Sequence, residues 1–266
     1  MKSIFAIVLL AVIISCNNSA TTEKKEAMSM PGAYTMLSQT VNDGKKDTVY
    51  ANLKQLKIYT PDFMMYANVN PADSVSGFGI GTYSSDSGMI KENVIYNASD
   101  TSANDSPGSF TLMIEKTGKG YKQIIPEITT SNNTKIKLTE EYETAGTSPA
   151  TALDGAWKET KAYTVKGKDT IPNKAIQYKT YYGGHFIFGH TYKDSVNKIH
   201  TGMGYGTFTM GSANKITENV VASTYGSIRG KSFDIAIEMT GKDEFKQTIS
   251  ETNGEIGVEF YQRLKK

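Results

Sequence analysis

The sequence predicts an all-β protein with two tandem small up-and-down antiparallel β-barrels, of about eight strands each. Three observations support this fold class. A glycine-spaced stretch occurs twice, as Gly-Phe-Gly-Ile-Gly-Thr-Tyr at 77–83 and as Gly-Met-Gly-Tyr-Gly-Thr-Phe at 202–208, which indicates an internal repeat. Apolar residues recur at every second position, and no stretch after the N-terminal segment has a helical period. Turn-forming residues (Gly, Asn and Asp) separate the alternating runs.

Residues 1–15 have the pattern of a signal peptide that directs export. Lys2 supplies a basic start, and an apolar run from Ile4 to Ile14 follows that is too short to span a bilayer. The tetrapeptide Ile-Ile-Ser-Cys at 13–16 resembles the lipobox of bacterial lipoproteins. The resemblance implies cleavage before Cys16 and lipidation of Cys16, and an ordinary secretory signal is the alternative.

Charge and cysteine content narrow the class of protein further. Cys16 is the only cysteine, so no disulfide can form within the chain and burial must hold the fold. A formal net charge of +2 on 266 residues argues against a nucleic-acid partner. Residues 16–30 are polar and predict a flexible tether. We therefore expect a protein of the bacterial cell envelope that is anchored to a membrane by lipid, with the outer membrane or the cell surface favoured.

Two matched units account for the rest of the chain. We place the first barrel at residues 31–145 and the second at residues 153–266, with a linker of small and turn-forming residues at 146–152. The repeat continues beyond the glycine-spaced stretch, because Ile-Glu-Lys-Thr-Gly-Lys at 114–119 matches Ile-Glu-Met-Thr-Gly-Lys at 237–242. We therefore expect both units to fold by the same plan.

The alternating runs predict the strands of each unit. In the first unit, strands are expected near residues 33–40, 54–60, 62–69, 77–84, 89–96, 109–116, 121–128 and 135–143, with counterparts in the second. Such a meander removes its own edges when it closes into a barrel. A single transmembrane barrel is disfavoured, because its strands need ~9–11 residues and an apolar outer face, whereas the outward positions here include Lys91.

The opening of the second unit resembles a known family. Gly155-Ala156-Trp157 is similar to the Gly-x-Trp signature of the lipocalins and the wider calycin group. In that group an Arg on the last strand packs across the Trp of the first strand, and the resemblance assigns this structural role to Trp157 and Arg263. The first unit has Tyr34 and Thr144 at these two positions. The resemblance implies lipocalin-like barrels, similar to those found in bacterial envelope lipoproteins.

Glu92 and Glu218 are predicted to point into the barrels. Each shares its strand face with apolar residues: Ile90, Val94 and Tyr96 in the first unit, and Ile216, Val220 and Ala222 in the second. A carboxylate buried among such residues must be paired, hydrogen-bonded or protonated. It can either anchor a ligand inside an apolar cavity or fix the fold.

Aromatic residues are the other candidates for a ligand site. The positions singled out are Tyr59, Tyr66, Tyr181, Phe188 and Tyr205. Rigid, partly polar rings suit the wall of a cavity, and ordinary core packing is the alternative. The alternate glycines leave one strand face bare, which either opens room for a ligand or lets a large neighbour pack close.

The sequence predicts no catalytic residue, no cofactor and no metal. His185, His190 and His200 all lie in the second unit. His185 and His190 would point to opposite faces of a strand and lie about 17 Å apart at ~3.3 Å per residue. A pair of histidines without a third ligand makes a weak metal site.

These patterns together predict a non-enzymatic envelope lipoprotein that binds or carries a small hydrophobic molecule in its barrels. The alternative is an adhesion or assembly module that binds a protein or a glycan through its outer surface. A third and weaker possibility is a barrel enzyme that uses Glu92 or Glu218 as an acid or base. An apolar cavity open at one end favours carriage, and a filled core with an exposed aromatic patch favours interaction.

Overall fold

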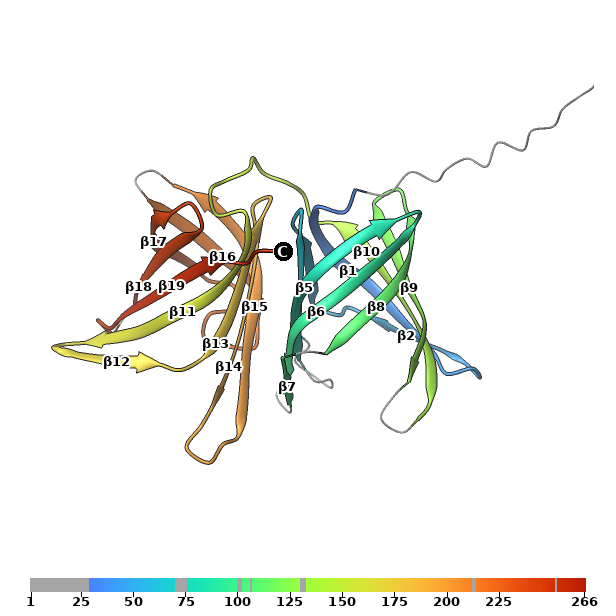
Figure 1. The fold of residues 1–266 in the computed structure, drawn as a ribbon, viewed down its shortest axis with the longest axis horizontal. Coiled ribbons are helices and arrows are strands. Elements are labelled where there is room, and N and C mark those ends of the chain that lie inside the picture. The colour runs from blue at the N-terminus through green and yellow to red at the C-terminus, as the bar shows by residue number, and fades with distance from the viewer. Residues whose placement is uncertain are drawn as a thin grey trace, which may run out of the picture.

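The computed structural model describes residues 29–69, 76–99, 102–105, 107–129, 133–211, 214–251 and 253–266. Residues 1–15, Cys16 and most of the tether lie outside the described residues. Within the described residues the chain forms strands and no helix, folded into two closed antiparallel barrels in tandem (Figure 1). This confirms the predicted fold class. A search of the same residues for a helix long and apolar enough to cross a membrane finds none.

Eight strands close the first barrel. Around the ring they are β1 (Gly32–Asn42), β3 (Gln55–Tyr59), β4 (Phe63–Asn68), β5 (Gly77–Asp86), β6 (Met89–Ser99), β8 (Gly108–Lys116), β9 (Gly120–Thr129) and β10 (Lys135–Thr144). Pairing of β1 with β10 closes the ring. Two shorter strands lie beside it: β2 (Asp47–Ala51) pairs with β1, and β7 (Ser102–Asn104) pairs with β6.

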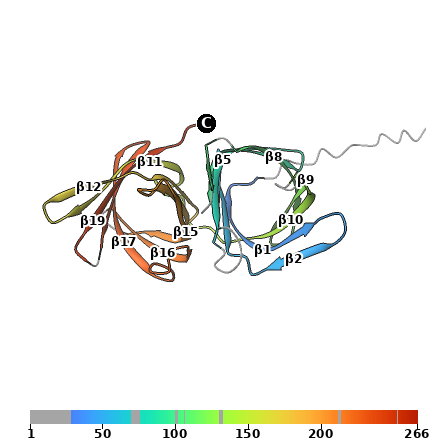
Figure 2. The same cartoon turned by 90° about the horizontal axis from the view of Figure 1, so that it is seen from below.

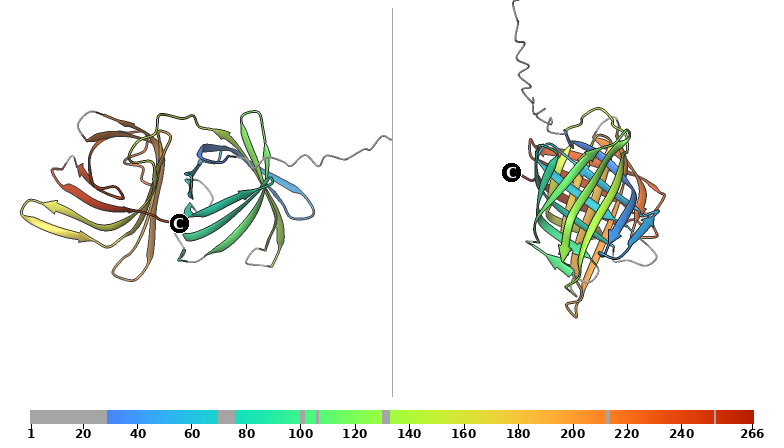
Figure 3. Two further views of the ribbon diagram at one scale, coloured as in Figure 1. Left: turned by 45° about the horizontal axis from the view of Figure 1, so that its top comes forward. Right: turned by 90° about the vertical axis from the view of Figure 1, so that its right-hand side faces the viewer.

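The second barrel repeats this plan. Its ring consists of β11 (Gly155–Lys166), β13 (Ile176–Tyr182), β14 (His185–Lys193), β15 (Ile199–Met210), β16 (Lys215–Ser223), β17 (Ser232–Gly241), β18 (Glu244–Ser250) and β19 (Ile256–Arg263). Pairing of β11 with β19 closes it, and β12 (Asp169–Asn173) extends β11. The arms β1–β2 and β11–β12 project at the two far flanks of the molecule (Figure 3).

A β-bulge in β6 determines on which face of the strand the last residues of β6 lie. Val94 belongs to the core inside the first barrel. The next residue, Ile95, has no partner in the register with β5, so Tyr96 faces outwards, because a bulge shifts the alternation by one position. The expectation that Tyr96 shares the inner face was therefore wrong. The second barrel has the same bulge at Val221, and Ala222 lies outside for the same reason.

The outer faces of β1 and β3–β6 in the first barrel pack against those of β11 and β13–β16 in the second and join the two barrels (Figure 2). We call the apolar residues buried there the interface cluster: Ala33, Leu56, Ile58, Phe63, Met65, Ala67, Val69, Phe78, Ile80, Tyr96 and Ala98 from the first barrel, and Ala156, Tyr178, Ile187, Met203, Tyr205 and Ala222 from the second. Polar contacts add to it, since the Thr201 hydroxyl donates to the Ser99 carbonyl oxygen at 2.6 Å. Burial of both apolar faces holds the barrels side by side.

A residue that precedes the first strand seals one end of each barrel. Met30 and Leu153 are 1% and 0% exposed. The Tyr34 hydroxyl donates to the Met30 carbonyl oxygen at 3.1 Å, and Trp157 Nε1 donates to the Leu153 carbonyl oxygen at 2.8 Å. The chain therefore enters each barrel at its closed end, and the linker crosses between the barrels there (Figure 1).

Arg263 covers Trp157 at the closed end of the second barrel. The guanidinium carbon lies 4.0 Å from the ring centre, within the range of a cation–π contact. The two residues are direct partners in the pairing of β11 with β19, and Arg263 Nη1 also donates to the Asp154 carbonyl oxygen at 2.5 Å. Tyr34 and Thr144 are the corresponding partners in the first barrel.

Candidate functional site: the two barrel cavities

Each barrel holds an internal cavity in the half opposite its closed end. The first has a volume of about 320 Å³ and the second about 280 Å³. Apolar side chains form part of both walls: Val94, Phe110, Leu112 and Ile125 in the first, and Phe188, Val220, Ile228, Phe233, Ile235 and Ile249 in the second. These volumes are at the small end of those found for ligand pockets.

The alternate glycines of β5 and β15 make room for aromatic rings inside the barrels. A Cβ atom on Gly79 would lie 2.6 Å from the Tyr66 ring, and one on Gly204 would lie 2.7 Å from the Phe188 ring. Tyr66 and Phe188 each line a cavity. The glycines were expected either to open room for a ligand or to let a large neighbour pack close, and the structure shows close packing at Gly79 and Gly204. Gly77 also forms part of the wall of the first cavity.

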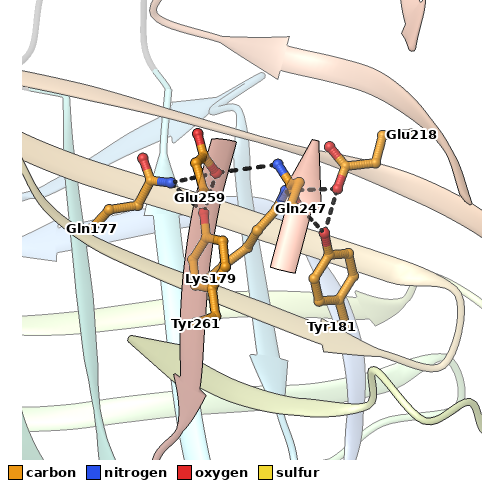
Figure 4. Close-up of polar contacts among 7 residues, drawn as sticks. All are labelled: Gln177, Lys179, Tyr181, Glu218, Gln247, Glu259 and Tyr261. Carbon is orange, nitrogen blue, oxygen red and sulfur yellow. Dashed lines mark hydrogen bonds and ion pairs between the residues drawn. The ribbon is translucent and has the colours of Figure 1, made fainter. Parts of the chain in front are cut away.

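A buried lysine–glutamate ion pair lies in the wall of each cavity. Lys57 Nζ is 2.6 Å from Glu92 Oε1, and Lys179 Nζ is 2.7 Å from Glu218 Oε1 (Figure 4). All four side chains are buried. Because an unpaired charge at such a site costs several kcal/mol, pairing offsets the cost of burying each of these side chains inside the barrel.

A buried tyrosine donates a hydrogen bond to the glutamate of each ion pair. The hydroxyl groups of Tyr59 and Tyr181 donate to Glu92 Oε1 and Glu218 Oε1, both at 2.6 Å. Burial and the adjacent glutamate charge raise the pKa of Tyr59 and of Tyr181 well above the usual value. Both hydroxyl groups therefore stay protonated and act as hydrogen-bond donors.

A second carboxylate, Glu140, lies in the wall of the first cavity. Gln123 Nε2 and the Tyr142 hydroxyl donate to Glu140 Oε2, both at 2.9 Å, and Gln39 Nε2 donates to Oε1 at 2.9 Å. The Gln123 amide oxygen in turn accepts from Lys57 Nζ at 3.1 Å. The network therefore connects the ion pair to the second acid.

Glu259 occupies the equivalent place in the second cavity (Figure 4). The Tyr261 hydroxyl donates to Glu259 Oε2 at 2.6 Å, and Nε2 of Gln177 and of Gln247 each donate to it at 3.2 Å. Burial raises the pKa of Glu259, and the positive charge of Lys179 opposes that rise in part. The second network thus repeats the first with the same residue types.

Sequence reasoning did not select the lysines, the glutamines or the second glutamates as site residues. The missed residues are Lys57, Gln123 and Glu140 in the first barrel and Lys179, Gln247 and Glu259 in the second. The signal that could have found them is the repeat itself, since each polar type recurs at the matching position of the other unit. Without the repeat, a lysine or glutamine that lies between apolar residues of a strand is predicted to face the solvent.

The second cavity differs from the first at its mouth. His190 Nδ1 lies 3.1 Å from Gln177 Oε1, and His190 Nε2 lies 2.7 Å from the Tyr225 hydroxyl. Burial lowers the pKa of His190 to about 4, so the imidazole is neutral near neutral pH. Asn68 has the corresponding register position in the first barrel, and its Oδ1 is buried without a hydrogen-bond partner among the described residues.

The predicted ligand-binding residues fall into three places. Glu92 and Tyr66 line the first cavity and Glu218 and Phe188 line the second, Tyr59 and Tyr181 lie behind the ion pairs, and Tyr205 belongs to the interface cluster. Tyr205 faces outwards because it alternates on β15 with glycines that face inwards. It therefore lies outside both cavities, contrary to expectation.

The histidines do not converge on a metal site. No group of three or more His, Cys, Asp or Glu side chains that could hold a metal ion occurs in the described part of the chain. His190 is engaged by Gln177 and Tyr225 as described above, and His200 Nε2 lies 2.8 Å from Asp194 Oδ2.

Comparison with known proteins adds no family assignment, because no family model and no curated protein sequence matches the chain. The likeness to the lipocalins is therefore one of architecture. Two closed eight-stranded antiparallel barrels in tandem are consistent with a two-domain lipocalin-like fold.

Proposed function

We propose that the protein is a non-enzymatic lipoprotein of the bacterial envelope that holds a small, largely hydrophobic molecule inside its barrels. The observation that carries the proposal is the internal cavity of each barrel, where apolar and aromatic side chains share the wall with several fixed polar groups. Ligand sites in proteins are usually built in this way. At roughly 30 Å³ per water molecule in the liquid, cavities of about 320 and 280 Å³ have room for about ten water-sized groups, which suits a small ligand.

Both cavities open at the same end of the molecule. Asn97 lines the first cavity, and Ser99 follows it on β6. His190 lines the second cavity, and its neighbour Thr191 pairs with Thr201. The hydrogen bond from Thr201 to Ser99 therefore places the two mouths side by side.

The position of the mouths suits a protein held by an N-terminal lipid. The chain enters the first barrel at its closed end, through Met30. A tether of residues 16–30 would therefore join the fold opposite the mouths, which leaves both mouths directed away from the point of attachment. The lipid on Cys16 is the proposed membrane contact, and several acyl chains give a stable anchor.

The alternative, an adhesion or assembly module, has less support. The most extensive apolar outer faces of the barrels are buried against each other in the interface cluster. An enzyme based on Glu92 or Glu218 has less support as well, because each carboxylate is held by a lysine and a tyrosine. Ligand binding in the cavities therefore explains more features of the two barrels than adhesion or catalysis does.

Native mass spectrometry of the protein, gently extracted from its own host, tests the proposal. We expect a discrete bound mass that disappears on denaturation. Val220 lines the second cavity, so Val220→Phe should fill it and reduce the adduct. Its neighbour Val221 is 61% exposed, so Val221→Phe is a matched control that should leave the adduct unchanged. An empty wild-type protein would overturn the proposal, as would an adduct that Val220→Phe and its first-barrel counterpart Val94→Phe together leave intact.

A further inference from the structure

Acids outnumber lysines in the lining of each cavity. The first has Glu92 and Glu140 with Lys57, and the second has Glu218, Glu251 and Glu259 with Lys179. Lys57 and Lys179 are already paired with Glu92 and Glu218. Among the described residues, no Lys, Arg or His forms an ion pair with the second carboxylate of either network, Glu140 or Glu259. The groups that donate to these two carboxylates are neutral amides and tyrosine hydroxyls.

The second barrel adds a further acid near Glu259. Glu159 lies on β11 opposite Tyr261, whose hydroxyl donates to Glu259. Glu159 Oε2 is buried and has no hydrogen-bond partner within the described part of the chain. Burial, and then the charge of Glu259, raise the pKa of Glu159 to about 8. With Glu159, the described interior of the second barrel holds more carboxyl groups than lysines.

An aromatic ring faces the same space in each cavity. Tyr66 is the register partner of Lys57, and Phe188 is the register partner of Lys179. Close packing over a glycine fixes both rings in the cavity wall. The face of an aromatic ring attracts a cation, so ring and excess carboxylate favour the same kind of ligand group.

We infer that the ligand carries a positively charged amine, bound by Glu140 in the first cavity and by Glu259 in the second, with its apolar part against the cavity wall. This inference rests on the proposed function, since it names the chemistry of the molecule that the cavities hold. An ammonium group supplies the missing positive charge and donates hydrogen bonds to the carboxylate.

A ligand with a carboxylate group fits the same walls poorly. The lysine of each cavity is already neutralised by a glutamate at 2.6 or 2.7 Å. A second anion would therefore find no unpaired lysine among the described residues of either wall and would lie beside Glu140 or Glu259, where two acids disfavour each other's charged form. The geometry thus separates amines from fatty acids of the same length.

Three probes of matched length test the inference: hexylamine, hexanol and hexanoate, each added to the full mature protein and measured by native mass spectrometry. We expect hexylamine to bind at least about tenfold more tightly than hexanoate, a difference of about 1.4 kcal/mol. Hexanol should lie between them, because it has the same apolar part and no charge.

Glutamine variants show whether the two carboxylates cause the preference. The double variant Glu140→Gln with Glu259→Gln should lose the preference for hexylamine and still bind hexanol, which shows that the cavities remain intact. Glu259→Gln alone tests the second barrel if the double variant does not fold. Glu238 pairs with Lys246 on the outer surface, so Glu238→Gln is the control that should keep the preference.

The possible results separate the inference from the proposed function. If hexanol and hexanoate bind as well as hexylamine, or if the glutamine variants keep the preference, the amine inference is wrong and cavity binding still stands. If no probe binds, and the protein from its host is empty as well, the proposed function itself fails.

Discussion

At the scale of single residues, the charges inside the barrels are the main feature. Lys57 and Lys179 would cost several kcal/mol if they were buried alone, and each lies within an ion-pair distance of one glutamate. Tyrosine hydroxyls and glutamine amides donate further hydrogen bonds to these glutamates and to Glu140 and Glu259. Glu159 is the exception, because its Oε2 has no partner in the described part of the chain.

Glu159 should therefore make stability depend on pH. Its pKa of about 8 in the folded protein lies above the ordinary 4.5, so the folded state holds a proton that the unfolded state releases between these values. Binding of this proton stabilises the folded state fully below about pH 4.5, and the stabilisation is lost as the pH rises towards 8. Glu159→Gln mimics the protonated form. At about pH 8 it should raise the free energy of unfolding by on the order of 1 kcal/mol, a value reduced for the partial exposure of the group.

Urea unfolding at about pH 5 and about pH 8 measures this effect. The wild type should lose stability between the two, and Glu159→Gln should lose less, with the two proteins similar at the lower pH. Glu238→Gln, at an exposed carboxylate, should follow the wild type. If Glu159→Gln and the wild type lost the same free energy of unfolding between the two pH values, Glu159 would not be the source of the pH dependence.

At the scale of elements, glycines and bulges set the shape of the strands. The alternate glycines of β5 and β15 admit inward rings and close backbone contacts. The bulges at Ile95 and Val221 then turn the ends of β6 and β16 outwards. One barrel wall can thus supply residues both to the cavity and to the interface cluster, because a bulge re-aims the side chains that follow it.

Gly206 offers a direct test of this close approach. A Cβ atom there would collide with the Asn219 carbonyl oxygen of the neighbouring strand β16. Since backbone cannot move aside as a flexible side chain can, Gly206→Ala should lower the free energy of unfolding by about 1–3 kcal/mol.

The matched control for this substitution is Gly257→Ala in β19. There the nearest atom to an added Cβ lies 3.8 Å away, an ordinary van der Waals contact, so the change should stay within about 0.5 kcal/mol of the wild type. Thermal or denaturant unfolding compares the two variants. Similar losses for both would show that the close contact at Gly206 is not the cause.

At the scale of the whole molecule, the interface cluster joins two barrels that each close on themselves. Phe78 of the first barrel packs on Gly189 of the second, where a Cβ atom would lie 2.5 Å from the ring. Tyr96 and Tyr178 meet across the same interface with their ring centres 5.2 Å apart. The interface holds both mouths at one end, which a flexible linker alone could not do.

Gly189→Val should therefore separate the barrels without unfolding either one. We expect a larger radius of gyration in X-ray scattering and two unfolding transitions in place of one. Trp157 is the only tryptophan and lies inside the second barrel, so its fluorescence reports that barrel, whereas circular dichroism reports both.

Gly226→Val controls for the added bulk, since nothing lies within 4 Å of a Cβ atom at Gly226. It should keep the wild-type radius of gyration and a single transition. An unchanged radius for Gly189→Val would show that the interface tolerates the added side chain and that this contact does not hold the barrels together.

Much of the architecture could be predicted from local patterns. The repeat and the alternation of apolar residues predicted two barrels, and they predicted that Glu92 and Glu218 point inwards, because a strand has a period of two. The alternation of apolar residues in β6 could not reveal the bulge before Tyr96, since no residue type in the sequence marks the extra position. It also could not show that the outward Tyr205 is buried by the other barrel.

Residue spacing was enough to predict the all-β class, the doubling of the barrel and the inward direction of two acids, because these depend on spacing within a strand or between copies. Only the folded structure shows which lysine pairs with which glutamate, which buried acids have no lysine partner, and that the two cavities open side by side. Those properties depend on strand pairing, bulges and the contact between barrels, which bring together residues far apart in the chain.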